Sequence, residues 1–138
     1  MSRSRITPSV LTAVAVGGAV GSAARYGLTV LWPTPPGAFP WATLAANLLG
    51  SALLGALMQL ITVRTIPHRL LTPFLGTGVL GGYTTFSAYA LEVWELFATG
   101  HSAPAVAYLL TTLVGGLAAV RLGAWAVPAA WAATLGRS

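Results

Sequence analysis

The stretch from Trp41 to Val63, WATLAANLLGSALLGALMQLITV, decides the fold of this chain. It contains no charged residue and no proline. A helix of about 20 apolar residues crosses the roughly 30 Å hydrocarbon core of a bilayer, and this stretch is long enough to do so. We therefore predict that it is a transmembrane helix.

Three other stretches are also long and predominantly apolar, and together the four occupy most of the 138 residues. The predicted spans cover about residues 9–32, 41–63, 70–97 and 103–127. Only 7% of the chain is charged, whereas soluble domains carry about a quarter charged residues. We predict an all-α membrane protein, a single transmembrane domain over residues 1–138 with four transmembrane helices.

The charged residues exclude several classes of function. All seven basic residues are arginines scattered between apolar blocks, whereas nucleic-acid binding needs clustered positive charge. The chain has no cysteine, which excludes disulfides, thiolate metal sites and a cysteine nucleophile. We find no acid–base pair or cofactor motif, so we predict neither an enzyme nor a nucleic-acid partner.

The distribution of arginines predicts one orientation in the cell membrane. With four spans, the links on one side hold no Arg or Lys, and the other side holds Arg3, Arg5, Arg64, Arg69 and Arg137. Positive charge favours the cytoplasm, so both termini are predicted to be cytoplasmic. The N-terminal pattern also fits a cleavable signal peptide, but the apolar stretch continues beyond the length such a peptide needs.

Polar residues form a stripe along the second predicted span. They recur every four residues and so share one helix face: Thr43, Asn47, Ser51, Gly55 and Gln59. Tyr108 and Thr112 repeat this spacing on the fourth span. Hydrogen bonding between helices and the lining of a wet pore both explain such a stripe.

The third predicted span contains a segment that is unfavourable for a helix. Gly81 and Gly82 are followed by YTTFSAY at residues 83–89, and paired glycines with β-branched residues weaken a helix interior. We expect the helix to break here, with a plain kink as the alternative. Freed carbonyl groups at such a break can bind a cation.

Four remaining features also bear on packing and on the ends of the spans. Gly17 and Gly21 form a G-x-x-x-G pair typical of close helix packing. Arg25, inside the first span, either extends to the membrane interface or supplies positive potential to an anion entrance. Arg121 fits an interface anchor, and Glu92 and Glu95 fit the end of the third span.

These motifs together resemble the Fluc/CrcB fluoride channels over nearly the whole chain. The matching segments are GGAVGSAARY at residues 17–26, ATLAANLLGS at residues 42–51 and GTGVLGGYTTFSAYALE at residues 76–92. The resemblance implies passive fluoride export by an antiparallel dimer in which two four-helix protomers of opposite orientation enclose a structural sodium ion at their interface.

The resemblance also implies roles for particular residues. It places six residues on the ion pathway: Asn47, Phe86, Ser87, Tyr89, Tyr108 and Thr112. It assigns the backbone carbonyls of Gly81 and Thr84 to sodium. It gives Arg25 and Glu92 vestibule or structural roles.

Two residues depart from the family pattern, which usually reads TTFSTF where this chain reads TTFSAY. Ala88 replaces a threonine, and Tyr89 replaces a second phenylalanine. One pore is therefore expected to be altered. Together with the one-sided arginines, this suggests a heterodimer with a paralogue of opposite charge bias.

Two other functions fit four apolar spans. A small multidrug resistance-type exporter has a similar size, but a proton-coupled exporter needs a carboxylate within the membrane and the first span has none. A membrane anchor or assembly subunit would need neither aligned polar stripes nor a broken third span.

Overall fold

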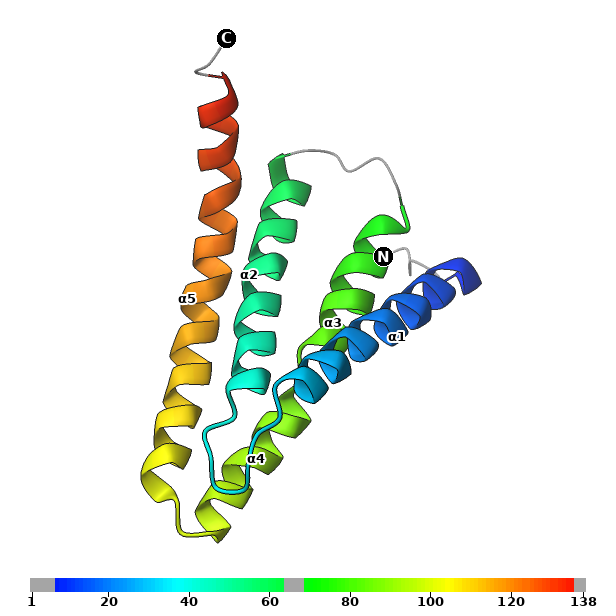
Figure 1. Ribbon diagram of the computed structural model, residues 1–138. Helices are drawn as coiled ribbons and strands as arrows, with labels where there is room; N and C mark the ends of the chain where they lie inside the picture. Colours follow the sequence, from blue (N-terminus) through cyan, green and yellow to red (C-terminus); the bar gives the residue numbers. More distant parts are fainter. Residues whose placement is uncertain (1–6, 64–68, 136–138) are drawn as a thin grey trace, which may run out of the picture.

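The computed structural model describes residues 7–63 and 69–135, and these residues form helices joined by short links (Figure 1). In chain order the elements are α1 (Pro8–Leu31), α2 (Trp41–Val63), the π-helix η1 (Pro73–Leu80), α3 (Gly81–Tyr83), α4 (Phe86–Ala98) and α5 (Ser102–Leu135). Arg3, Arg5, Arg64 and Arg137 lie outside the described residues, so the predicted orientation stays a prediction.

Three helices among the described residues are long and apolar enough to cross a membrane: Pro8–Leu31, Trp41–Thr62 and Ser102–Ala129. They match the first, second and fourth predicted spans. Residues 70–97 are divided among η1, α3 and α4. The helix α5 continues beyond the fourth predicted span, through Pro128 to Leu135, because proline removes one helical hydrogen bond without ending the helix.

The helices associate as two pairs. The helix α2 packs mainly against α5, and α1 packs mainly against η1 and α3. Figure 1 shows the pairs diverging, with α4 continuing below α3 toward the start of α5. The α1–α2 and α4–α5 links lie at one end, and α1 begins and α5 ends toward the other.

Glycines allow the backbones within each pair to approach closely. A Cβ atom on Gly17 would collide with the carbonyl oxygen of Phe74, and one on Gly21 with that of Val79. In the other pair, Gly55 faces the Val120 carbonyl in the same way. The packing role predicted for Gly17 and Gly21 is confirmed by these contacts, which lipid-embedded helices use instead of a hydrophobic driving force.

A cluster of buried apolar residues lies near the end that carries the α1–α2 and α4–α5 links. It consists of Leu44, Leu96, Ala105 and Tyr108. Most large apolar side chains are exposed instead, including Leu31 at 85% and Trp125 at 70%. Apolar side chains on the outside suit a lipid environment, so the chain is a multi-pass membrane protein.

Candidate functional site

An open groove of about 460 Å³ runs between the two helix pairs. Its walls come from α2, from η1 through α4, and from α5. The polar or glycine residues in these walls are Asn47, Gly50, Ser51, Gly76, Gly81, Thr84, Thr85, Tyr89, Thr112 and Gly116. The groove is therefore the place where the polar stripe of α2 meets the irregular segment that follows α3.

The chain leaves the helical conformation between α3 and α4. Thr84 has φ −78° and ψ 157°, and Thr85 has φ −149° and ψ 125°, so both are extended. We call these two extended residues, Thr84 and Thr85, the non-helical step. The Asn47 side chain makes two hydrogen bonds to it. Its Nδ2 donates to the Thr85 carbonyl oxygen at 3.0 Å, and the Thr85 N–H donates to Asn47 Oδ1 at 2.8 Å.

The threonine side chains complete the step. Thr84 Oγ1 donates to the Leu80 carbonyl oxygen at 3.0 Å, and Thr85 Oγ1 accepts from the Ala88 N–H at 3.2 Å. Thr85 thus caps the N-terminus of α4. In a continuous helix the Thr85 N–H would bind the Gly81 carbonyl. Because Asn47 takes that N–H, the Gly81 carbonyl is freed beside the groove.

Two residues of α1 bind the backbone of α3. Ser22 Oγ and Arg25 Nε on α1 both donate to the Gly82 carbonyl oxygen, at 3.4 Å and 3.3 Å. The side chain of Arg25 is half-buried. The charge within the first span therefore contacts backbone inside the protein.

The groove also contains a polar atom that nothing in the described part of the chain satisfies. Thr112 Oγ1 is buried and has no hydrogen-bond partner among the described residues. Phe86 is 79% exposed at the groove, and its ring centroid lies 5.8 Å from that of Tyr89. The Tyr89 hydroxyl donates to the Leu109 carbonyl oxygen at 3.3 Å.

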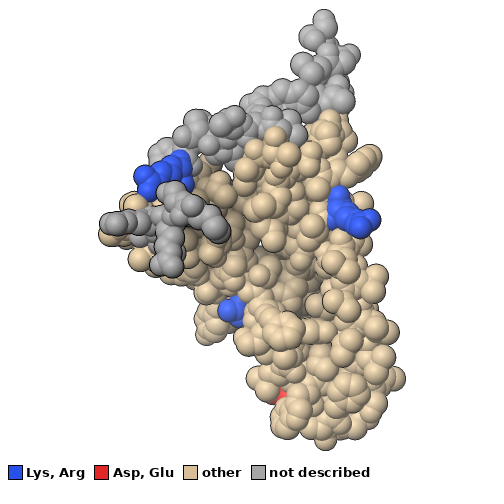
Figure 2. Space-filling model, turned by 180° about the vertical axis from the view of Figure 1, so that it is seen from behind, with Lys and Arg blue, Asp and Glu red and all other residues tan. Residues whose placement is uncertain are grey.

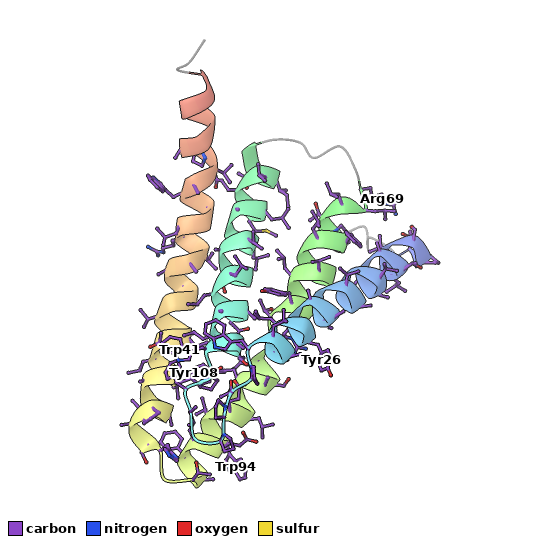
Figure 3. The ribbon with its side chains drawn as sticks, viewed as in Figure 1. Tyr26, Trp41, Arg69, Trp94 and Tyr108 are labelled. Carbon is purple, nitrogen blue, oxygen red and sulfur yellow. The ribbon has the colours of Figure 1, made fainter. Side chains whose placement is uncertain are left out.

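Glu92 is the centre of a separate polar cluster. Its Oε1 accepts from Thr43 Oγ1 at 2.6 Å, and its Oε2 accepts from the Tyr108 hydroxyl at 2.7 Å. Thr43 and Tyr108 are buried. Figure 3 shows Tyr108 in the lower part of the bundle, and its ring packs edge-on against that of Phe39. The cluster ties α2, α4 and α5 together at this end.

Glu92 also lines a second cavity, of about 420 Å³, under the proline-rich link at residues 34–40. Glu95 and Thr99 line the same cavity. Both carboxylates thus lie toward the link end of α4, within the helix instead of after it. Figure 2 shows acidic surface only as a small spot near this end, and arginine surface as small separated patches elsewhere.

The structure brings together six of the ten predicted site residues in the groove: Asn47, Gly81, Thr84, Phe86, Tyr89 and Thr112. The other four lie outside it. Tyr108 and Glu92 bind each other, Arg25 binds Gly82, and Ser87 is exposed with its hydroxyl oxygen 3.4 Å from Thr85 Oγ1.

Sequence reasoning did not single out two residues that shape the site. Thr85 receives both Asn47 hydrogen bonds, and Ser22 shares the Gly82 carbonyl with Arg25. A signal for Ser22 was available. It precedes Arg25 by three residues, and helical residues three apart lie on one face.

The fold and the groove define a class of protein: a small multi-pass helical membrane protein with a polar groove among its helices. The family described as "CrcB-like protein, Camphor Resistance (CrcB)" matches residues 12–124. The chain belongs to this family.

Curated relatives carry a more specific name. The "Fluoride-specific ion channel FluC 1" of Streptomyces coelicolor is 49% identical over 88% of this chain and 79% of its own length. The "Fluoride-specific ion channel FluC 2" of Nocardia farcinica is 46% identical over 92% and 89%. The "Fluoride-specific ion channel FluC" of Paracoccus denitrificans is 47% identical over 80% and 87%.

Proposed function

We propose that this chain is a protomer of a fluoride-specific channel that lets cytoplasmic fluoride leave the cell passively. The observation that carries the proposal is the groove, which combines hydrogen-bond donors with an aromatic ring among helices of membrane-spanning length. The names of its relatives support fluoride as the ion. Membership of this family gives no support to the exporter alternative.

The chemistry of the groove suits a small anion that holds its water tightly. A pore must replace the lost water with donors and still release the ion. Thr112 holds a buried hydroxyl that has no partner among the described residues, and one of the two Asn47 Nδ2 hydrogens remains after the bond to Thr85. The positive edge of the exposed Phe86 ring is a further weak partner. Tyr108, which lies outside this groove, would contribute to the path only through the Glu92 cluster.

The complete pore is proposed to need a second four-helix protomer in antiparallel orientation. Two observations support this. The groove is open on one side, and α1 and α5 expose many large apolar residues. A paralogue as partner remains part of the proposal, supported by the numbered names of relatives. The interrupted segment η1–α3–α4 would supply the third span.

A sodium ion at the dimer interface is also proposed, and the residues present fit it. The Gly81 carbonyl has lost its helical donor to Asn47, and Gly81 and Thr84 both line the open groove. Carbonyl oxygens of unwound backbone are suitable sodium ligands. Bound sodium would supply fixed positive charge that joins two protomers.

Fluoride efflux from proteoliposomes tests the function. We expect the purified chain to release fluoride, and Asn47→Asp and Phe86→Ile to reduce this release strongly. Phe97→Ile is the matched control, because Phe97 is an exposed phenylalanine of α4 outside the groove. No efflux from the wild-type chain, alone or with a paralogue, would contradict the proposal.

A cysteine crosslink tests the dimer, and the absence of native cysteine gives a clean background. A cysteine at Gly81 should form a crosslinked dimer in membranes. Crosslinked homodimers that carry fluoride would exclude an obligatory heterodimer. Crosslinking only after co-expression with a paralogue would support one.

A further inference from the structure

The Gly82 carbonyl lies where α1 crosses the end of α3. In a continuous helix the N–H of Phe86 would donate to it, but the extended residues Thr84 and Thr85 intervene. An unpaired carbonyl at membrane depth is costly. Ser22 and Arg25 replace the missing donor from a different helix.

The face of α1 that carries these donors is the face that packs against α3. A Cβ atom on Gly82 would collide with the carbonyl oxygen of Gly18, and one on Gly21 would collide with the backbone of Val79 and Tyr83. Ser22 and Arg25 continue the same face toward the end of α1. Tyr26, the next residue, is 70% exposed and projects away from the bundle in Figure 3. Arg25 is therefore turned inward, toward α3.

We infer that Arg25, assisted by Ser22, is a positioning residue that fixes the non-helical step between α3 and α4 from the α1 side. Asn47 holds the same step from the α2 side. Together they hold the ends of residues 82–85 and keep the groove-facing carbonyls in place. The inference rests on the proposed function, because this step lines the proposed fluoride path.

Two features separate this role from a purely electrostatic one. Ser22 is neutral, yet it donates to the same oxygen as Arg25. The Arg25 contact uses Nε, an atom that lysine lacks. The two side chains should therefore behave as a coupled pair, since each compensates only in part for the loss of the other.

Amide hydrogen exchange of the full-length purified protein tests the inference, with Ser22→Ala, Arg25→Gln and the double variant. In Arg25→Gln we expect exchange at residues 83–88 to be about tenfold faster, as for loss of one hydrogen bond from a charged donor. Ser22→Ala should increase the exchange rate less. The fold increase in the double variant should exceed the product of the fold increases in the two single variants. Arg121→Gln is the matched control, because it removes an exposed arginine on α5 and should leave this segment unchanged.

A role through charge alone predicts a different pattern. Exchange at residues 83–88 would be unchanged in Arg25→Gln, Ser22→Ala would add nothing, and Arg25→Lys would restore fluoride efflux fully. That result would overturn the inference. If Arg25→Gln fails to fold, Ser22→Ala decides, since no change in its exchange at residues 83–88 also overturns it. Failure of the proposed function can be distinguished from failure of this inference. It would appear as an absence of fluoride efflux from the wild-type protein, whereas hydrogen exchange can still be measured.

Discussion

Two polar contacts start one helical turn apart on α2 and reach the same stretch of chain, yet they do different things. Asn47 binds the backbone of Thr85 at a non-helical step beside the open groove. Thr43 binds the carboxylate of Glu92, together with Tyr108, in a buried cluster. The first contact replaces hydrogen bonds that a helix would have made, and the second joins three regular helices.

The difference indicates that the step and the cluster have separate tasks. At the step, side chains offset the cost of leaving the helix, and the Gly81 carbonyl loses its helical donor beside the groove. In the cluster, every polar group named is paired, and the gain is rigidity at one end of the bundle. Fluoride efflux should therefore depend more on Asn47, whereas Glu92 should affect mainly the stability of the fold.

The largest expected effect is that of Asn47→Leu. It leaves the Thr85 N–H without its partner, at about 1–3 kcal/mol for an unsatisfied group, and it removes the side-chain donor to the Thr85 carbonyl. Fluoride efflux should fall at least about a hundredfold, and the melting temperature should drop. The control is Ser51→Ala, on the same α2 stripe and in the same groove, which should change efflux only slightly. Similar effects of both variants would remove the special role of Asn47.

Glu92→Gln should come next, and it should act on stability more than on transport. It removes charge from an acceptor of two hydroxyl hydrogen bonds, each worth about 1.5–3 kcal/mol when the partner is charged. Thermal unfolding in detergent measures the change. Glu95→Gln, which alters an exposed carboxylate of the same helix, should unfold like the wild type. A loss of efflux without loss of stability in Glu92→Gln would contradict the division of tasks.

A double-mutant cycle of Thr43→Val and Tyr108→Phe tests whether the cluster acts as one unit. Each single variant should cost about 1 kcal/mol of unfolding free energy. Because both hydroxyls bind one carboxylate, the two costs should not add. Strict additivity within about 0.3 kcal/mol would mean that the hydroxyls act independently.

The smallest expected effect is that of Tyr89→Phe, which restores the aromatic residue usual in the family. The Tyr89 hydroxyl makes one long hydrogen bond to the Leu109 carbonyl, at 3.3 Å. Its loss should cost less than about 1 kcal/mol. Efflux should stay within about threefold of the wild type, because the ring keeps its place against Phe86. A much larger change in efflux would place the hydroxyl itself on the ion path.

The sequence predicted the long helices well, since length and absence of charge decide them locally. It also predicted close packing at Gly17 and Gly21. The continuation of α5 beyond the fourth predicted span had no signal in the sequence, because Pro128 is compatible with a helix whose other hydrogen bonds persist. The π-helical form of Pro73–Leu80 had no signal in hydropathy.

Six of the ten predicted site residues line the groove, but their contacts were not predictable from the sequence. The four-residue spacing identified Asn47, but not that its amide would bind Thr85 on another helix. Glu92 has no pattern that indicates two hydroxyl donors, because the contact with Tyr108 depends on how α4 packs against α5. Contacts of this kind depend on tertiary structure, which periodicity does not encode.

The most direct test of the account is the reversal potential of the purified channel in a planar bilayer, with fluoride on one side and chloride at the same concentration on the other. A groove built to replace the water of fluoride predicts a potential far from zero, in the direction of fluoride permeation. A potential near zero would mean that the two anions cross equally, and it would contradict the central claim.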